Sequence, residues 1–440
     1  MVSHDLESES EKTGVRTPDP EKRAKECGSV GQPEVDFPEG GWRAWLVVLG
    51  VWLGQFSTFG YTNAYGVYND FYVRDYLKDR YTSSQISWIG STQLFLTLSL
   101  GLVSGRGFDT GYFYHLVFGG YVLMIFCMFM VSITQPGQYY QLFLSQGLGV
   151  GIAVGISYVP SYGLLAHYFK RRRATAMGIA ASGSAIGGAV HPIMLNQLFH
   201  GRVGFHAGVR ASAGLLAGLL TISFLLLRPR LPFTSRKQGS TLINLRTFLR
   251  DPPYVFMVIG TALVLSGLYF PIFFLQLHTI TNGLDSNFAF YTLVMLNGAS
   301  ALGRILPNML ATRIGVFNVI VPCVAASAIL VYCSLAIKDV AGTIIFALLY
   351  GFFSGACNLL PPMIGSLAEK DTEIGARMGI CFTFTGFGGL VGTPIAGALL
   401  STSFIWWRPV LFAGLCVTFG ALCFTMSRFL ASRQKGTQWL

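Results

Sequence analysis

Long apolar blocks alternate with short polar segments along most of the chain. We count twelve blocks of roughly 20 residues, centred near positions 55, 95, 123, 151, 185, 217, 266, 299, 325, 353, 388 and 419. A helix of about 20 residues spans the ~30 Å hydrocarbon core of a bilayer. Helices also satisfy their backbone polar groups without water. The pattern therefore predicts an all-α membrane protein with twelve transmembrane helices.

Polar segments divide the chain into halves. Residues 1–40 hold ten acidic and five basic residues and almost no large apolar ones, so we expect a disordered cytosolic tail. The longest internal interruption, 229–251, is basic and separates six blocks from six, which predicts a cytosolic linker between an N-terminal half at 41–228 and a C-terminal half at 252–430. Residues 431–440 form a second cytosolic tail. Two pseudo-symmetric six-helix halves suggest the repeat architecture of major facilitator transporters.

Composition and charge agree with a membrane protein. The chain is 52% hydrophobic and 12% charged, whereas a soluble protein carries about 25% charged residues. The net charge is +11, but its distribution argues against nucleic-acid binding. With a cytosolic amino terminus, cytosolic segments hold 24 of the Lys and Arg residues and external loops hold 7. This asymmetry predicts that both termini are cytosolic, and it leaves lipids and a small-molecule substrate as the expected partners.

Motifs of catalysis and cofactor binding are missing from the sequence. It contains no HExxH, no GxSxG, no CxxC and no Walker-type GxxxxGK[ST], and the predicted spans hold no paired carboxylates. The cysteines lie mostly in apolar blocks, as small buried hydrophobes do. We therefore expect a protein that is not an enzyme or a primary pump, with no cofactor and no metal site.

Four stretches resemble one family. They are "PEGGWRAWLVVLG" (Pro38–Gly50), "YFKRRRATAMGIAASGSAIGG" (Tyr168–Gly188), "NGASALGRILP" (Asn297–Pro307) and "IGARMGICFTFTGFGGLVGTPIAGALL" (Ile374–Leu400). They are similar to motifs of the monocarboxylate transporter family of the major facilitator superfamily, in its fungal branch. The resemblance covers nearly everything after residue 36 and implies twelve helices in two halves.

Several motif residues have structural interpretations. Glycines allow close backbone approach, tryptophan belongs to the interfacial aromatic belt, and basic clusters fix topology. We expect conformational or topological roles for Gly40, Gly41, Trp42, Asp109, Arg171 and Arg172. The small residues of the fifth predicted helix should let it pack closely on a neighbour; these are Gly178, Ala181, Ser182, Ala185 and Gly188.

An arginine inside the eighth apolar block is the strongest functional candidate. Asn297, Ser300 and Arg304 stand at i, i+3 and i+7, which places them on one helical face. A charge at a bilayer centre costs about 2.5 to more than 10 kcal/mol, so it needs compensation. The planar guanidinium matches a carboxylate. The alternatives are an arginine that snorkels to the interface or pairs with backbone carbonyls.

The resemblance implies that Arg304 binds the substrate anion. The family usually has an aspartate four residues earlier, where this chain has Ser300. It also has a lysine near the end of the first helix, where the alignment places Asn63. Asn358 precedes "LLPP" in the tenth predicted helix, which borders the cavity in this architecture. These departures favour a substrate that is larger or less charged than lactate.

Proton coupling has one main candidate. Every Asp and Glu falls outside the twelve predicted spans, whereas proton-driven carriers commonly use an intramembrane carboxylate. His191, in the fifth predicted helix, titrates near neutrality and suits this role. Alternatively it is a packing histidine beside Pro192, bonded to a backbone carbonyl. We therefore expect either a facilitator or a carrier whose transport has a pH midpoint of roughly 6–7.

The sequence thus favours a secondary transporter of a small organic acid or related metabolite that works by alternating access. An exporter of a secondary metabolite and an uptake carrier for a vitamin-like ring compound remain open. A non-transporting nutrient sensor on a carrier fold is the alternative of another class, although the tail is short for signalling. We expect a monomer in the plasma membrane.

Overall fold

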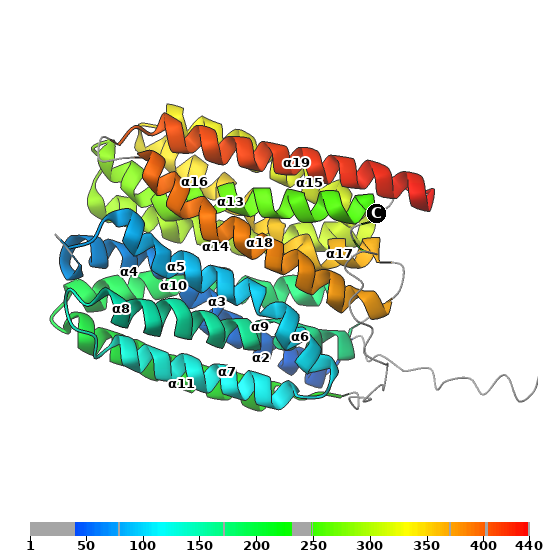
Figure 1. Cartoon of the computed structure of the whole chain (residues 1–440), viewed down its shortest axis with the longest axis horizontal. Helices are drawn as coiled ribbons and strands as arrows, with labels where there is room; N and C mark the ends of the chain where they lie inside the picture. The colour runs from blue at the N-terminus through cyan, green and yellow to red at the C-terminus, as the bar shows by residue number, and fades with distance from the viewer. Residues whose placement is uncertain are drawn as a thin grey trace, which may run out of the picture. The chain divides into compact units, whose positions relative to one another are not determined.

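The computed structural model describes residues 40–77, 80–169, 172–230, 248, 250–368, 371–400 and 404–438, with only the backbone described at 83, 109, 174, 200, 358, 359 and 371–376. These residues form helices and turns, with no β-strand among them (Figure 1). Twelve helical stretches in this part of the chain are long and apolar enough to cross a membrane. The predicted all-α membrane fold is confirmed.

Several elements of the first half are broken helices. The six spans are formed in order by α2 (Trp42–Ser57), α3 (Phe59–Asn63), α4 (Tyr65–Phe71) and the π-helical η1 (Tyr72–Tyr76); α5 (Ser83–Ser99) and α6 (Gly101–Asp109); α7 (Phe113–Val131); α8 (Tyr139–Leu142), η2 (Phe143–Val150), α9 (Gly151–Gly163) and η3 (Leu164–His167); α10 (Arg173–His200); and α11 (Gly204–Leu226).

The second half has longer continuous helices. Its spans are formed by α13 (Pro252–Thr281); α14 (Ser286–Ile314); α15 (Val316–Cys333) with η4 (Ser334–Ala336); α16 (Val340–Gly355), η5 (Ala356–Leu359) and α17 (Leu360–Leu367); α18 (Asp371–Leu400); and α19 (Trp407–Lys435). The last helix therefore continues beyond residue 430, where the sequence suggested the start of a tail.

Polar residues mark the starts of several helices. Thr82 and Gln85 form a reciprocal capping box before α5. Asp285 and Asp339 accept hydrogen bonds from backbone amides in the first turns of α14 and α16. Such caps satisfy amides that have no partner within the helix. Asp285 and Asp339 thus lie where a helix begins, at the ends of apolar spans.

The same packing scheme recurs in the two halves. In the first half, α2 packs on α10 and α11, α5 packs on α9, and α7 packs on α11. In the second half, α13 packs on α18 and α19, α14 packs on α16, and α15 packs on α19. Each half encloses its own large hydrophobic cluster, around Tyr68 and Phe113 in the first and Phe317 and Tyr350 in the second.

Two helix pairs join the halves. α10 packs along α14, and α5 packs along α18, so the fifth span of each half meets the second span of the other. A Cβ added at Gly178 of α10 would lie 2.8 Å from the carbonyl oxygen of Arg304, and one at Gly188 would lie 2.7 Å from Oδ1 of Asn297. The expected close packing of the fifth helix is thus confirmed at these glycines.

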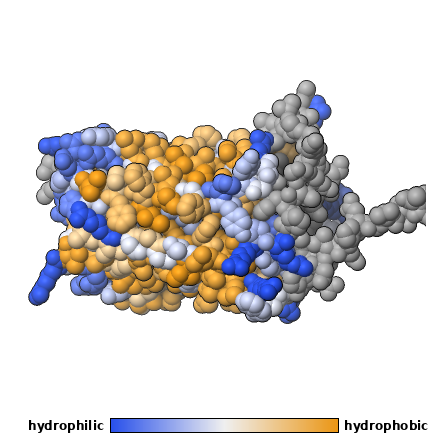
Figure 2. All heavy atoms as spheres, turned by 90° about the horizontal axis from the view of Figure 1, so that it is seen from below, coloured by the Kyte–Doolittle hydropathy of each residue, from blue (hydrophilic) through white to orange (hydrophobic). Residues whose placement is uncertain are grey.

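A hydrophobic band covers the lipid-facing side of the molecule. Figure 2 shows orange residues across the middle of one face, with hydrophilic residues toward both ends of the band. On α7, Phe118, Val122 and Phe126 recur every four residues and are about half exposed. In water such a stripe would be an unpartnered apolar surface, but hydrocarbon is its natural solvent.

The first span is interrupted twice. Thr58 separates α2 from α3, and its hydroxyl donates to the carbonyl of Gly54 at 2.6 Å. Ala64 separates α3 from α4, and its amide bonds three residues back to Tyr61 instead of four. Interrupted backbone at membrane depth is tolerated where protein buries it or a cavity adjoins it. The five-residue segment α3 therefore marks a special part of this span.

One expectation about carboxylates is wrong. Asp70 and Asp75 lie within the first helical span, Trp42–Tyr76, and not outside it. This span has 35 residues, or about 50 Å at 1.5 Å per residue, well beyond the ~30 Å hydrocarbon core. Asp70 pairs with Arg74 at 2.7 Å, and both side chains are partly exposed. The apolar block in the sequence ends before the helix does, and the additional helical turns carry both aspartates.

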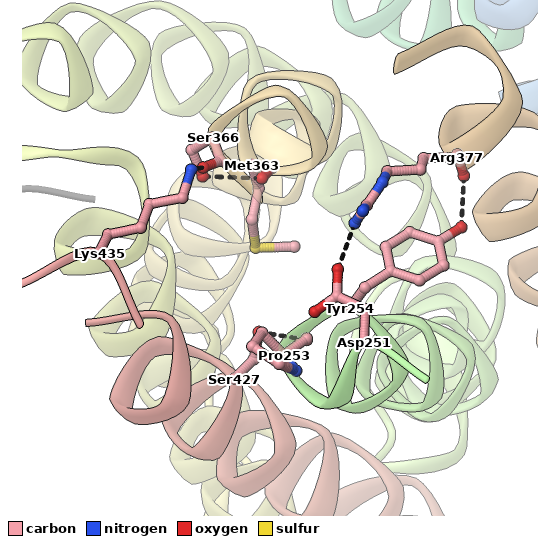
Figure 3. A network of polar contacts seen from close by, with 8 residues as sticks. All are labelled: Asp251, Pro253, Tyr254, Met363, Ser366, Arg377, Ser427 and Lys435. Atoms are coloured by element: carbon pink, nitrogen blue, oxygen red, sulfur yellow. Dashed lines mark hydrogen bonds and ion pairs between the residues drawn. The ribbon is translucent and has the colours of Figure 1, made fainter. Parts of the chain in front are cut away.

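A polar network fastens the start of α13 to α18 (Figure 3). Nη1 of Arg377 pairs with Oδ2 of Asp251 at 2.5 Å, and the hydroxyl of Tyr254 donates to the carbonyl of Arg377 at 2.7 Å. The guanidinium also lies 5.1 Å from the ring centre of Phe248 and 5.0 Å from that of Tyr254. An arginine that is 4% exposed is thereby paired and stacked.

Candidate functional site

A cavity lies between the two halves. Its volume is about 110 Å³, measured as the space open to the centre of a water molecule, which is room for several waters at ~10–15 Å³ each. The first half contributes residues of α3, α5 and α9, and the second contributes residues of α13, α14, α16, α17, α18 and η5. The lining residues are Phe59, Asn63, Leu98, Tyr158, Leu265, Leu268, Tyr269, Ile272, Leu296, Asn297, Ser300, Arg304, Ser354, Gly355, Cys357, Leu360, Phe382 and Thr385.

Arg304 is the one charged residue among these lining residues. Its Nη1 donates to the carbonyl oxygen of Ala181 at 3.1 Å and to the hydroxyl of Ser184, both on α10 of the other half. Its Nε lies 3.5 Å from the hydroxyl of Ser300. Nη2 has no hydrogen-bond partner, and no carboxylate pairs with the guanidinium, within the described part of the chain. The carbonyl pairing that the sequence left open is present, but at one edge of the guanidinium only.

The three candidates on α14 face the same space. Asn297, Ser300 and Arg304 all line the cavity, as their spacing predicted. The amide of Asn297 donates to the carbonyl of Leu293 at 3.0 Å within its own helix, which leaves its Oδ1 toward Gly188. Asn297 and Ser300 are 4% and 5% exposed, so they are shielded by protein. Their polar atoms therefore face α10 and the cavity and not lipid.

Asn63 joins this group from the first half. It ends α3 and lines the cavity, and its Nδ2 lies 3.5 Å from the carbonyl oxygen of Ser184. A Cβ added at Gly188 would lie 3.1 Å from the Cβ of Asn63, so α3, α10 and α14 meet at this glycine. The structure thus brings together Asn63, Asn297, Ser300 and Arg304; their roles in binding stay predictions.

Two tyrosines extend the polar end of the cavity. Tyr158 of α9 and Tyr269 of α13 line the cavity together with Arg304. Neither hydroxyl forms a hydrogen bond with any described residue. The ring of Tyr158 lies 5.5 Å from that of Phe59, centre to centre. The cavity thus offers hydroxyl donors and aromatic faces beside one guanidinium.

The remainder of the wall is apolar. Leu98, Leu265, Ile272 and Leu360 line the cavity together with Phe382. Leu98 and Tyr269 also belong to a small hydrophobic cluster that crosses between the halves. An apolar wall with a few convergent polar groups is the usual composition of a small-molecule site. The arrangement can hold a compound with an apolar body and one acidic or hydrogen-bond-accepting end.

His191 lies apart from this cavity. It is fully buried in α10, its Nε2 lies 3.1 Å from the carbonyl oxygen of Phe56, and its ring packs 4.6 Å from the ring of Phe56 and 5.1 Å from that of Tyr61. It is not among the described residues that line the cavity. This geometry favours the packing alternative, and proton coupling through His191 remains untested.

The motif residues have mixed placements. Gly41 caps α2 with φ +86°, a value that favours glycine, and Gly40 precedes it with φ +154°. Trp42 is 69% exposed, as a residue of an interfacial belt would be. Arg172 is exposed at the start of α10. Three candidates lie outside the description: Arg171 entirely, and the side chains of Asp109 and Asn358.

Sequence reasoning does not single out several of the lining residues. Tyr158 and Tyr269 stand among many aromatic residues that could stack on a ring-bearing substrate. Ser354 and Thr385 donate to carbonyls of their own helices, at 3.2 and 2.7 Å, as serine and threonine commonly do in membrane helices. The one local feature that the two tyrosines share is a proline two residues later, Pro160 and Pro271 respectively, in otherwise apolar spans.

Comparison with known proteins identifies the family. The Major Facilitator Superfamily profile matches residues 47–366, which run from the first span of the first half into the fourth span of the second half. The chain belongs to the major facilitator superfamily. This superfamily member is an integral, multi-pass membrane protein that transports a small molecule and is not an enzyme. The match does not distinguish the monocarboxylate family within the superfamily.

Curated relatives cover almost the whole chain. The aspyridones efflux protein of Emericella nidulans is 35% identical over 88% of this chain and 78% of its own length. The agnestins efflux protein of Paecilomyces divaricatus is 33% identical over 97% of this chain and 96% of its own. An MFS-type transporter of Aspergillus niger is 35% identical over 98% and 99%. The transporter therefore resembles fungal carriers, some of which are named for efflux.

Proposed function

We propose that this transporter exports an organic compound that has an apolar, ring-bearing body and an acidic end, and that Arg304 binds the acidic end. The observation that carries the proposal is the open edge of the guanidinium. Nε is held only weakly by Ser300, and Nη2 has no partner among the described residues. Arginine binds a carboxylate through two parallel N–H donors, and this edge offers such a pair.

The rest of the cavity supports a compound larger than a short aliphatic acid. Phe59, Tyr158 and Tyr269 present aromatic rings near Arg304. The hydroxyls of the two tyrosines can donate to a carbonyl or phenolate oxygen. Relatives named for efflux of aspyridones and agnestins support export as the direction. Uptake by the same cavity remains the alternative.

A place in or near the monocarboxylate transporter family also belongs to the proposal. Ser300 and Asn63 both line the cavity at the positions where that family usually has an aspartate and a lysine. With neither charge present, Arg304 is the only formal charge that the described lining offers to a substrate. A single weakly acidic group is therefore the expected partner.

We infer that transport follows the substrate gradient, without a proton site in the cavity. No acidic residue is among the described lining residues, and His191 is packed elsewhere. Alternating access of the two halves is consistent with the two helix pairs, α10 with α14 and α5 with α18, that join them. We further propose a monomer in the plasma membrane with both termini in the cytosol; protease protection of tags at both ends, in intact cells, tests the orientation.

Binding of simple aromatic acids to the purified full chain tests the role of Arg304. Phenylacetate and 2-naphthoate would be compared with phenylacetamide and 2-naphthamide, by isothermal titration and by counterflow in liposomes at neutral pH. We expect the acids to bind at least about tenfold more tightly than the amides. Arg304→Gln should remove this preference, and Arg304→Lys should keep only part of it because the planar fork is lost.

Arg313→Gln is the matched control, because Arg313 is exposed in the last turn of the same helix. It should bind like the unaltered protein. Equal affinity for acids and amides, or undiminished acid binding by Arg304→Gln, would contradict an anion site at Arg304. Accumulation of the acids against their gradient, by cells that express the transporter, would contradict both export and transport down the gradient.

A further inference from the structure

Arg304 belongs to one half of the transporter, but two of its hydrogen-bond acceptors belong to the other. Its Nη1 binds the hydroxyl of Ser184 and the carbonyl oxygen of Ala181, both on α10. These bonds cross the α10–α14 interface beside the cavity. The same guanidinium therefore has one edge fixed by the first half, whereas Nε and Nη2 at its other edge have no described partner in that half.

We propose that Ser184 is a positioning residue for substrate binding: it orients the guanidinium of Arg304 across the two halves, so that the free edge points into the cavity only while α10 and α14 are packed together. The proposal deepens the proposed function and rests on it. Ser184 does not itself line the cavity, so its effect on a ligand passes through Arg304.

The hydroxyl of Ser184 is well suited to this task. It donates to the carbonyl of Ala181 at 2.9 Å within α10, which turns its lone pairs toward Arg304. This bond within α10 persists when Arg304 moves away. Separation of the two helices therefore leaves no buried hydroxyl on α10 without a hydrogen bond. The bond between Arg304 and Ser184 can therefore break without leaving the Ser184 hydroxyl unpaired, whereas the guanidinium of Arg304 must find another acceptor.

Glycines allow the approach that the tie requires. Gly178, six residues before Ser184, lies against the carbonyl of Arg304, and Gly188, four residues after it, lies against Asn297. These positions place Ser184 in the middle of the contact between the two helices. A guanidinium held at the centre of a closely packed interface loses its orientation when the interface opens.

Linkage gives the consequence for transport. If the binding geometry of Arg304 exists only in the state with α10 and α14 together, an anion that binds Arg304 must favour that state. Removing the Ser184 hydroxyl should weaken anion binding, and it should also uncouple binding from the packing of α10. A residue that merely stabilises the fold would not change the preference for acids over amides.

The test uses the full chain and four variants. Ser184→Ala removes the acceptor, Ser184→Thr keeps a hydroxyl, Ser182→Ala removes a hydroxyl of α10 that bonds to Trp52 within the same half, and Arg304→Gln removes the charge. Titration with phenylacetate and phenylacetamide gives affinities. Hydrogen–deuterium exchange of α10 and α14, with and without phenylacetate, reports their packing.

We expect Ser184→Ala to weaken phenylacetate binding about tenfold, to leave phenylacetamide unchanged and to abolish the phenylacetate-dependent protection of α10. Ser184→Thr should restore both properties, and Ser182→Ala should behave like the unaltered protein. Without any ligand, Ser184→Ala should speed exchange in α14 as well as in α10, because the tie joins them.

Unchanged acid preference in Ser184→Ala, or faster exchange in α10 alone, would overturn the positioning role. If the unaltered protein bound neither acid nor amide, the proposed substrate would be wrong. The ligand-free exchange would then decide separately whether Ser184 ties the halves together through Arg304. Equal effects of Ser182→Ala and Ser184→Ala would show that the hydroxyls matter only for the folding of α10.

Discussion

Gly178 of α10 lies directly against the backbone carbonyl of Arg304 on α14. A Cβ at this glycine would lie 2.8 Å from the carbonyl oxygen and 3.1 Å from the Cβ of Asn308. Backbone cannot rotate away as a side chain can, so any larger residue must move one helix. Arg304 therefore carries the charge of the cavity and also takes part in a close backbone contact between the halves.

Gly178→Ala should accordingly separate the halves near Arg304. Overpacking of this kind costs about 1–3 kcal/mol, and we expect phenylacetate binding to weaken by roughly tenfold or more. Titration of the purified variant measures the change. Gly214→Ala on α11 is the control, since a Cβ there meets nothing within 4 Å. Unchanged phenylacetate binding by Gly178→Ala would show that α10 and α14 can accommodate a methyl group at this point.

The hydroxyls of the two cavity tyrosines should each contribute to the binding of an aromatic acid. Tyr158→Phe and Tyr269→Phe keep the rings but remove hydroxyls that have no other described partner. A neutral hydrogen bond contributes about 0.5–1.5 kcal/mol, so each variant should lose roughly three- to tenfold in 2-naphthoate affinity. Tyr291→Phe, at an exposed position of α14, should have no effect. Unchanged binding in both cavity variants would place the ligand elsewhere.

His191→Gln should leave the pH dependence of transport unchanged. The ring is buried against Phe56 and Tyr61 and bonds to a backbone carbonyl, which is a packing environment. We expect the substitution to lower the free energy of unfolding by about 1–3 kcal/mol, because glutamine fills the site of the ring poorly. Counterflow of phenylacetate between pH 5 and 8 measures the dependence. A profile with a midpoint near 6–7 that His191→Gln flattened would restore the histidine as a proton site.

Breaking the Asp251–Arg377 pair should destabilise the second half. Asp251→Asn leaves a buried guanidinium without its carboxylate, which costs about 3–5 kcal/mol in comparable cases. The exchanged pair Asp251→Arg with Arg377→Asp should recover part of the loss. Thermal unfolding of the purified protein measures both. Asp339→Asn is the control, because asparagine caps α16 as well as aspartate does; equal losses there would indicate a general charge effect.

Helical periodicity was sufficient for part of the site. The spacing of Asn297, Ser300 and Arg304 fixes them on one face, and one charge among apolar residues implies a cavity on that face. This holds because all three belong to one continuous helix, α14. The resemblance to a known family added Asn63, although the breaks around α3 make a register argument from sequence unreliable there.

Contacts between helices were beyond the reach of the sequence. The bond from Arg304 to Ser184 depends on the register of two helices from different halves, and no local pattern records that register. Tyr158 and Tyr269 reach the cavity for the same reason, from α9 and α13. Asp70 and Asp75 show a different limit of the sequence. Hydropathy indicates where the apolar part of a span ends, whereas the helix continues until its backbone hydrogen bonding stops.

The short segment α3 sets the direction of two side chains in the cavity wall. Phe59 and Asn63, which both line the cavity, lie between the two interruptions at Thr58 and Ala64. A three-residue bonding step, as at Ala64, turns the next side chain by about 20° more than an α-helical step does. A substitution at either interruption should therefore change the direction of both an aromatic ring and an amide in the cavity wall. A carrier built this way can reshape its recognition surface with few substitutions, and acceptance of ligands of more than one shape is the expected result.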